Sequence, residues 1–255
     1  MYYTIFFDII SLQMKIDLHI HSCLSPCADL EMSPSEIVNK AKASGLEGIA
    51  LTDHQTAKNC PAAAVCAGNA NLPCLYGLEV QTSEEVHTLS IFDTLEQALE
   101  MTQWVYERMP KRVNDPDTFG DQPVVTWDND IVEMEWRILA MSTQRSIPET
   151  SVKTRELGGI YIAAHVDRPN FSVLGTLGAI PENYFDAVEL SRTADETLFA
   201  RHISPYAVVR SSDSHNLDDI GKVWTEVEAT ELSVAALKDA FDRKATRISP
   251  RLTAF

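Results

Sequence analysis

Two histidines near the start of the chain, His19 and His21, flank a single isoleucine in the stretch KIDLHIHS. If this stretch is a strand, both imidazoles point the same way, because side chains two residues apart share a face of a strand. Neutral imidazole is the commonest side-chain ligand of metals at physiological pH, so the two rings can bind one ion together. A lone His-x-His arises often by chance, and its interpretation as a metal site depends on what accompanies it.

Further residues of metal-binding type fall at the ends of other strand-like stretches. The chain has seven histidines, of which His202 falls in a helical pattern and is interpreted as a surface residue. The residues in or at the ends of expected strands are His54, Glu79, His87, His165, Asp213 and His215. The carboxyl ends of parallel strands meet at one mouth of a barrel. A structural zinc ion needs about four ligands, mostly cysteine, so this larger set indicates more than one ion.

Such a centre predicts hydrolysis of phosphate esters. Glu79 can bridge two ions, and Asp213 can complete the set of ligands. Two divalent ions about 3.5–4 Å apart stabilise both the attacking and the leaving oxygen during displacement at phosphorus.

The elements that position these residues alternate between strand-like and helix-like patterns. Strands are expected at residues 15–20, 47–51, 75–80, 86–92, 160–164, 185–190, 206–209 and 222–227. Helices are expected at residues 34–44, 61–70, 95–108, 131–143, 149–156, 193–202 and 233–243. Residues 109–130 are expected to form a long loop, which either covers the site or is an ordinary surface insertion. The alternation predicts an α/β fold with a parallel sheet, closed or open.

Length and composition favour one large domain. The chain has 255 residues, 45% of them apolar, so we expect a single barrel domain over residues 14–255 with a loop-helix insertion around residues 109–145. Residues 1–13 are apolar but lack the basic segment and cleavage site of a signal peptide. They are interpreted as an extra N-terminal arm or a mis-called start. An odd count of five cysteines and no apolar run of about 20 residues predict a cytoplasmic protein without membrane association.

The net charge of −16 bears on the partners. A protein that holds a nucleic-acid backbone in a long groove is normally basic, so the composition disfavours extended nucleic acid. Small phosphorylated substrates are not excluded, because two or three divalent ions add about four to six positive charges at one point. The sequence leaves the oligomeric state open.

The motifs around the candidate ligands resemble those of the polymerase and histidinol phosphatase (PHP) domain family. They are DLHIHS (17–22), LTDH (51–54), GLEV (77–80), His87, AH (164–165) and SDSH (212–215). The resemblance extends from about residue 14 to at least residue 221, with the motifs in the family's order. It implies a distorted (β/α)7 TIM-like barrel with its active site at the carboxyl ends of the strands. It also implies a metal-dependent phosphoesterase that binds two or three Zn, Mn or Fe ions.

The resemblance further implies which residues bind each ion. The expected sets are His19, His21, Glu79 and Asp213 for a first ion, Glu79, His87 and His165 for a second, and His54 and His215 for a third. The family often has another histidine at the third site, where this chain has Cys27. A thiolate can bind zinc or iron there; alternatively, the third site is weak or absent. Asp17 and Asp53 are expected to orient imidazoles or to fix local turns.

The expected mechanism is attack on phosphorus by a hydroxide that bridges the ions. His54 and His215, together with Asp213, are the candidate catalytic residues, because a protonated histidine can assist the leaving group. A guanidinium matches a phosphate bidentately, and an ammonium can also bind it. The candidate phosphate-binding residues, in order, are Arg168, Lys58 and Arg192. A surface salt bridge explains each of these three cations equally well.

The sequence therefore favours a phosphomonoesterase that acts on a small phosphorylated substrate. One alternative is a phosphodiesterase or exonuclease-like enzyme that trims short oligonucleotides. Another is a non-catalytic metal-binding module, against which the apparently complete first two ligand sets argue. A related hydrolase of C–N bonds is disfavoured, because such sites often use a carbamylated lysine and no expected strand ends in lysine.

Overall fold

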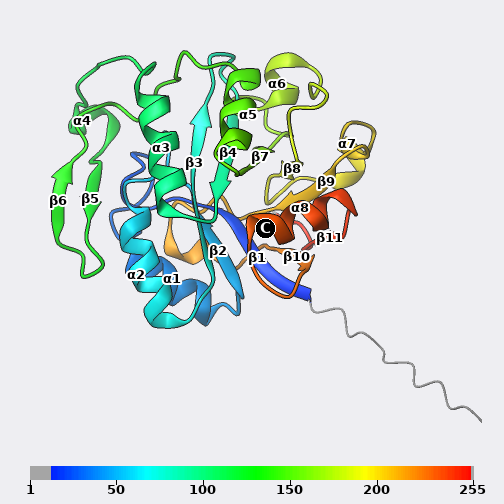
Figure 1. The fold of residues 1–255 in the computed structure, drawn as a ribbon, viewed down its shortest axis with the longest axis horizontal. Coiled ribbons are helices and arrows are strands. Elements are labelled where there is room, and N and C mark those ends of the chain that lie inside the picture. The colour runs from blue at the N-terminus through cyan, green and yellow to red at the C-terminus, as the bar shows by residue number, and fades with distance from the viewer. Residues whose placement is uncertain (1–12, 254–255) are drawn as a thin grey trace, which may run out of the picture.

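The computed structural model describes residues 13–253, so the expected N-terminal arm lies outside the described residues except for Gln13. A mixed sheet forms the centre of the molecule (Figure 1). Its strands are β1 (Gln13–Ile20), β2 (Gly48–Leu51), β3 (Cys74–Gln81), β4 (His87–Phe92), β7 (Ile160–Ala163), β8 (Ala187–Leu190), β9 (Ala207–Arg210), β10 (Thr225–Glu228) and β11 (Thr246–Ile248). They lie in the order β11-β10-β1-β2-β3-β4-β7-β8-β9.

This sheet curls into a nearly closed barrel. Strands β1, β2 and β3 pair in parallel, as do β7, β8 and β9, whereas β4 is antiparallel to both of its neighbours. The two edges of the sheet meet at a seam, where the Thr246 hydroxyl of β11 donates to the Val208 carbonyl of β9 at 3.0 Å. Beyond β9, the His21 amide donates to the Ser214 carbonyl at 3.1 Å and joins the carboxyl ends of β1 and β9. The predicted distorted α/β barrel is confirmed.

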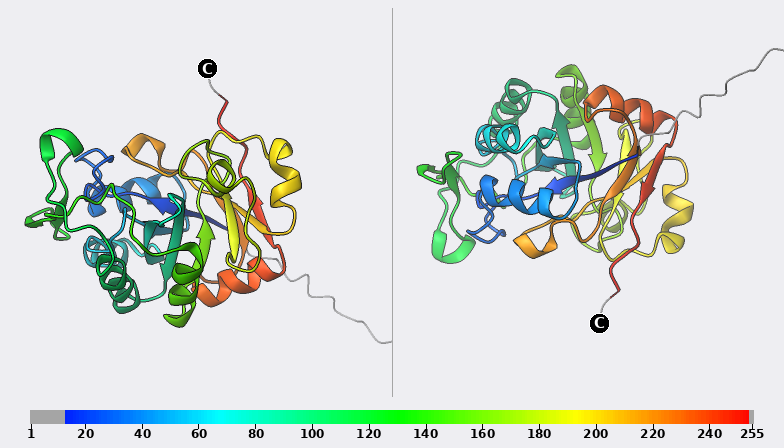
Figure 2. Two further views of the ribbon diagram at one scale, coloured as in Figure 1. Left: turned by 90° about the horizontal axis from the view of Figure 1, so that it is seen from above. Right: turned by 90° about the horizontal axis from the view of Figure 1, so that it is seen from below.

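Helices cover the outside of the barrel (Figure 2). They are α1 (Pro34–Ala43), α2 (Cys60–Ala70), α3 (Leu95–Tyr106), α5 (Ile147–Glu156), α6 (Val173–Leu177), α7 (Glu196–Ile203), α8 (Val234–Asp242) and the 3-10 turn η1 (Leu217–Asp219). The start of α1 shows why they form where they do, because the Ser33 hydroxyl accepts a hydrogen bond from the Glu36 amide and caps the helix. Among the helices of residues 13–253, none is long and apolar enough to cross a membrane.

The predicted helix at residues 131–143 is wrong. A short helix, α4 (Pro116–Phe119), is followed by a hairpin of β5 (Pro123–Val125) and β6 (Ile131–Met134). The hairpin turn is closed by Thr126, whose hydroxyl accepts from the Asp130 amide at 3.0 Å. Pairing with β5 overrides the local pattern, and the β-branched residues at the start of β6 suit a strand. The domain boundary at residue 14 and the insertion over residues 109–145 stay predictions.

The hairpin lies at one edge of the molecule, outside α2 and α3 (Figure 1), and one buried amide ties it to the barrel. The Asn59 side chain donates to the Ser22 hydroxyl at 2.9 Å and to the Pro123 carbonyl at 3.3 Å. Its oxygen accepts from the Val125 amide at 2.9 Å. Because Ser22 directly follows His21, this amide joins the hairpin to the strand that carries the two leading histidines.

Replacement of Asn59 by alanine should destabilise the protein. The change leaves the buried Val125 amide without its acceptor, and an unsatisfied buried group costs about 1–3 kcal/mol. We expect urea denaturation to report a free energy of unfolding about 2 kcal/mol lower. The matched control is Asn39→Ala on the exposed face of α1, which should change stability by no more than about 0.5 kcal/mol. Equal denaturation midpoints for the two variants would contradict this role of Asn59.

Candidate metal centre

His19, near the end of β1, and His21, just beyond it, converge as the sequence predicted. Both rings are fully buried, and His19 Nε2 lies 3.1 Å from His21 Nε2. Each second ring nitrogen has its own partner: His19 Nδ1 lies 3.0 Å from a carboxylate oxygen of Glu189, and His21 Nδ1 lies 3.0 Å from the Ser25 hydroxyl. Such partners fix the tautomer and the orientation of a metal-binding imidazole. The two Nε2 atoms are therefore left to face a common point.

A bulge in β1 contributes to this arrangement. Asp17 pairs with Ile49 and Ile20 pairs with Leu51, so β1 carries one more residue than β2 between these points. The extra residue lies between Asp17 and Ile20, the stretch that contains His19. Bulges commonly re-aim side chains next to active sites.

Asp213 closes the first group of potential ligands. Its Oδ1 lies 3.4 Å from His19 Nε2 and 3.2 Å from His21 Nε2. One ligand atom from each of these three buried residues lies within 4.8 Å of the others, a spacing that can hold a metal ion. The Asp213 backbone has a φ of +48°, and that of His165 has a φ of +29°. Left-handed backbone at a residue other than glycine stores strain, and such residues cluster at functional sites.

Glu79, at the end of β3, lies between the remaining imidazoles. Its Oε1 is 2.9 Å from His87 Nδ1 and 3.0 Å from His165 Nε2. Its Oε2 is 2.9 Å from His54 Nδ1. The carboxylate is 1% exposed, and its two oxygens contact different histidines, as expected of a ligand that could bridge two ions. His54, Glu79 and His87 form a second group with ligand atoms within 4.8 Å.

The predicted third set lies next to these groups. His21, His54 and His215 form a third group with ligand atoms within 4.8 Å. The Cys27 thiol lies near the imidazoles of His54 and His215, and both rings act on its pKa. Burial of the sulfur raises the pKa of this thiol, but the two imidazoles outweigh burial and lower it to about 6. The two imidazoles thus stabilise a thiolate at Cys27, the residue for which the sequence left open whether it is a ligand of the third ion.

The charges of the cluster fit a bound cation. Burial disfavours the charged form of His19, yet the Glu189, Asp213 and Glu79 carboxylates hold the pKa of this imidazole well above its usual value. Burial likewise disfavours charge on Glu79, yet the surrounding imidazoles hold the pKa of this carboxyl well below its usual range. Buried carboxylates of this kind require positive charge beside them, which protons on histidines or metal ions can supply.

The two aspartates predicted to support the centre act differently. The Asp53 carboxylate accepts from the Ser25 hydroxyl at 2.7 Å, and Ser25 in turn contacts His21 Nδ1. Asp53 therefore supports an imidazole through one intervening hydroxyl. Asp17 accepts from the backbone amides of His19 at 3.3 Å and Ser212 at 3.1 Å. Asp17 thus fixes the backbone where β1 meets the segment after β9.

Sequence reasoning missed Glu189. This fully buried residue is the second-to-last of β8. Its carboxylate contacts His19 Nδ1 and accepts from the His165 amide at 3.2 Å. Its position near the carboxyl end of a buried strand is the signal in the sequence, since the other potential ligands except His87 lie at or just past such ends. No histidine or aspartate stands next to it to mark the motif.

The three candidate phosphate-binding cations lie in different surroundings. The Arg168 guanidinium contacts the Asp213 carboxylate and its side chain is 41% exposed, so it stands beside the centre with donors to spare. Lys58 is held at 2.6 Å by both Glu133 and Glu135 of the hairpin segment. Arg192 is paired with the Asp219 carboxylate. Of the three, only Arg168 contacts a residue of the histidine-carboxylate cluster. This cluster consists of His19, His21, His54, Glu79, His87, His165, Asp213 and His215.

An open cavity of about 330 Å³ leads to the cluster. The residues that line it include Cys27, His54, Gln81, His87, Phe119 and Phe171. The Phe171 ring stacks on the His87 imidazole with ring centroids 5.0 Å apart and an interplanar angle of 18°. The predicted metal ligands therefore meet at one end of the barrel, below a mouth lined by Phe119 and Phe171. His87 comes from the amino end of β4 because this strand is antiparallel to its neighbours.

Two curated relatives match parts of the chain. It is 38% identical over 77 residues to the 3',5'-nucleoside bisphosphate phosphatase of Chromobacterium violaceum. The aligned residues make up 30% of this chain and 26% of the relative. It is 37% identical over 71 residues to the 5'-3' exoribonuclease of Haemophilus influenzae. These residues make up 28% of this chain and 25% of the relative. The chain thus matches about a quarter of the length of these relatives.

A solved structure matches nearly the whole chain. The lesion-specific endonuclease PfuEndoQ from Pyrococcus furiosus has a TM-score of 0.69 and 19% sequence identity, covering 93% of this chain and 58% of the endonuclease chain. At this level of identity the likeness is one of fold.

Family models complete the comparison. The model of the PHP domain matches residues 17–141, and a model described as PHP-associated matches residues 200–246. The first match contains Glu79 and the leading histidines. These matches lie in the N-terminal and the C-terminal part of the sequence, and the histidine and carboxylate motifs follow the family's order. The chain therefore belongs to the PHP domain family.

Proposed function

We propose that the chain is a metal-dependent phosphoesterase. The observation that carries this proposal is the position of Glu79, whose two oxygens face different imidazoles beside the group of His19, His21 and Asp213. Divalent ions held there would polarise the phosphate and make a water molecule nucleophilic near neutral pH. The relative named as a bisphosphate phosphatase supports the same chemistry. Two or three ions of Zn, Mn or Fe fit the nitrogen, oxygen and sulfur donors.

Residues of the chain supply the other requirements of the reaction. Arg168 can donate to the non-bridging phosphate oxygens as charge builds on them. The His215 Nδ1–H donates a hydrogen bond to the Asp213 carbonyl at 2.8 Å, so Nε2 is the ring nitrogen that can act on a substrate or an ion. That nitrogen can either give a proton to the leaving oxygen or bind a third ion together with Cys27 and His54.

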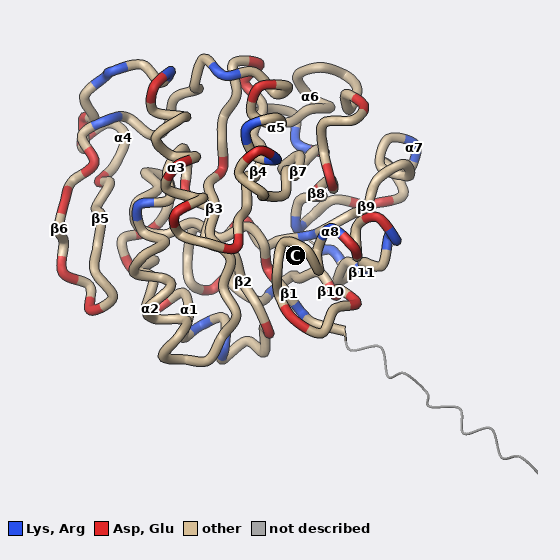
Figure 3. The backbone as a smooth tube through the Cα atoms, in the orientation of Figure 1, with Lys and Arg blue, Asp and Glu red and all other residues tan. Residues whose placement is uncertain are grey.

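The surroundings of the cluster favour a small phosphomonoester as substrate. The cavity at the mouth has a volume of about 330 Å³, and its Phe119 and Phe171 walls suit a leaving group with a flat ring. Figure 3 shows Lys and Arg scattered among more numerous Asp and Glu rather than gathered along one face. Together with the net charge of −16, this argues against a long groove for a nucleic-acid backbone.

A phosphodiesterase that acts on a nucleic-acid strand is the second candidate. The hairpin segment exposes the large side chains of Trp127 and Trp136, and the mouth exposes Phe171. Exposed aromatic rings bind unpaired bases by stacking. The likeness in fold to a lesion-specific endonuclease over 93% of the chain also favours this candidate.

The five cysteines support a cytoplasmic location as part of the proposal. All five are free, and Cys23, Cys60 and Cys66 are buried. Unpaired thiols are usual in reducing compartments.

Replacement of Glu79 by glutamine should abolish hydrolysis with little change in shape. Glutamine is isosteric but lacks the charge and the second carboxylate oxygen, so we expect kcat/KM to fall at least about 1,000-fold, equivalent to about 4 kcal/mol. The assay is phosphate release in the presence of Zn, Mn or Fe. Glu182→Gln, at an exposed position, is the control and should retain full activity. A folded Glu79→Gln variant with wild-type activity would contradict the assigned centre.

Replacement of Arg168 by glutamine should weaken the binding of a phosphomonoester, and a comparison of substrates with the wild-type protein should distinguish a phosphomonoesterase from a phosphodiesterase. We expect a KM at least about tenfold higher for a nucleoside monophosphate, because a charge-assisted bond to the terminal phosphate is lost. The wild-type protein should release phosphate from this substrate faster than it cleaves a labelled single strand or a duplex with an abasic lesion. Arg192→Gln is the control, since Arg192 is paired with Asp219. Cleavage of strands alone would replace the phosphomonoesterase with the second candidate.

A further inference from the structure

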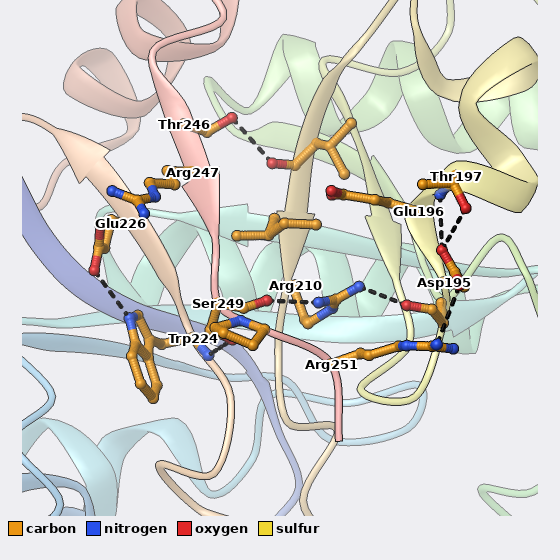
Figure 4. Close-up of a pocket in the computed structure, with 14 residues that line it drawn as sticks. Asp195, Glu196, Thr197, Arg210, Trp224, Glu226, Thr246, Arg247, Ser249 and Arg251 are labelled. Carbon is orange, nitrogen blue, oxygen red and sulfur yellow. Dashed lines mark hydrogen bonds and ion pairs between the residues drawn. The ribbon is translucent and has the colours of Figure 1, made fainter. Parts of the chain in front are cut away.

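A second and larger cavity lies beside the seam of the barrel. Its volume is about 740 Å³, and β9, β10, β11 and the first turn of α7 surround it. Figure 2 shows these elements at the opposite end of the molecule from the hairpin of β5 and β6. Three arginines, Arg210, Arg247 and Arg251, line it together with the carboxylates of Asp195, Glu196 and Glu226 (Figure 4). No member of the histidine-carboxylate cluster lines it.

The central feature of this cavity is the guanidinium of Arg210, at the end of β9. The residue is only 2% exposed. Its two amino groups donate to backbone carbonyls, those of Ser249 and Ala194, the latter at 2.8 Å. Within residues 13–253, its Nε–H has no hydrogen-bond partner and no carboxylate accepts a hydrogen bond from Arg210. A buried cation therefore lines the cavity with one donor unused.

A buried guanidinium with an unused donor destabilises the fold unless an anion binds it. Arginine does not lose its proton in proteins, and a buried charge is tolerated when a counter-charge and hydrogen bonds compensate it. Burial lowers the pKa of the Arg210 guanidinium and outweighs the carboxylates of Glu196, Asp167 and Asp195, which act in the opposite direction. The nearby Asp195 carboxylate is already engaged, since it accepts from Thr197 at 3.1 Å and from Arg251 at 3.1 Å. Among residues 13–253, therefore, no carboxylate forms a direct ion pair with Arg210.

We propose that this cavity binds a small molecule that carries a phosphate or carboxylate group, with an oxygen of that group accepting the Nε–H of Arg210. The volume lies within the range of about 300–1,000 Å³ that is usual for small-molecule sites. Arg247 is exposed at the rim, where it stands opposite Glu226 of β10. The half-buried ring of Trp224 supplies an apolar surface on the same wall. The site is separate from the metal centre and does not depend on the proposed function.

Nuclear magnetic resonance of the full-length protein tests the proposal at the atom concerned. The buried Nε–H of Arg210 gives its own ¹⁵N–¹H signal, which can be assigned through its backbone correlations. The protein, with the metal that it carries on purification, is titrated with sodium phosphate, sodium succinate and sodium chloride at matched ionic strength. We expect phosphate or succinate to shift this signal saturably at millimolar concentration or below, and chloride to leave it unchanged. The anion that acts identifies the group.

Variants separate this response from binding at the metal centre. Arg168→Gln should not alter the response of the Arg210 signal, because Arg168 contacts Asp213 and does not line this cavity. Arg247→Glu should weaken binding at least about fivefold through charge reversal at the rim. Arg243→Glu, an equal change of charge at an exposed arginine outside the cavity, should have no effect. An Arg210 signal that follows ionic strength alone, or equal affinities in the last two variants, would overturn the proposal.

Discussion

The burial of carboxylates among imidazoles is the constraint on which the rest of this structure depends. Glu79 and Asp213 are almost fully buried at the carboxyl ends of strands, where their charge would be costly without a positive partner. The imidazoles of His19 and His21 crowd the same point with their Nε2 atoms 3.1 Å apart. A cation relieves both problems at once, because it neutralises the carboxylates and uses the lone pairs of the rings.

Other parts of the fold can be understood as supports for this point. Glu189 and Ser25 each hold the second nitrogen of one leading histidine, so that the ligand nitrogen is directed inward. The extra residue of β1 and the left-handed backbone of His165 and Asp213 depart from regular strand geometry where side chains must converge. Such strain, of order 1–3 kcal/mol for each residue, persists where surrounding contacts compensate for it.

Much of this centre could be predicted because its chemistry is local in sequence. The alternation of strands places His54 and Glu79 at strand ends, and short motifs mark them. Glu189 could not be identified in this way, since a lone glutamate at a strand end has many structural roles. The environment of Lys58 depends on Glu135, a residue 77 positions away, so sequence could not decide between phosphate binding and a salt bridge.

The hairpin shows a different limit. The stretch from Ile131 to Met134 is short and apolar apart from Glu133, a pattern that fits either a helix or a strand. Its pairing with β5 and the turn at Thr126 decide for a strand, and the Asn59 side chain fixes the hairpin against the barrel. These contacts connect segments separated by up to 66 residues, which local propensity cannot register.

The central claim is that the histidines and carboxylates of the cluster hold metal ions. The most direct test is the metal content per chain, measured by elemental analysis of protein purified without a histidine tag and without chelators. The account predicts two or three equivalents of Zn, Mn or Fe per chain. A content near zero, with no uptake of any of these metals on reconstitution of the folded protein, would contradict it.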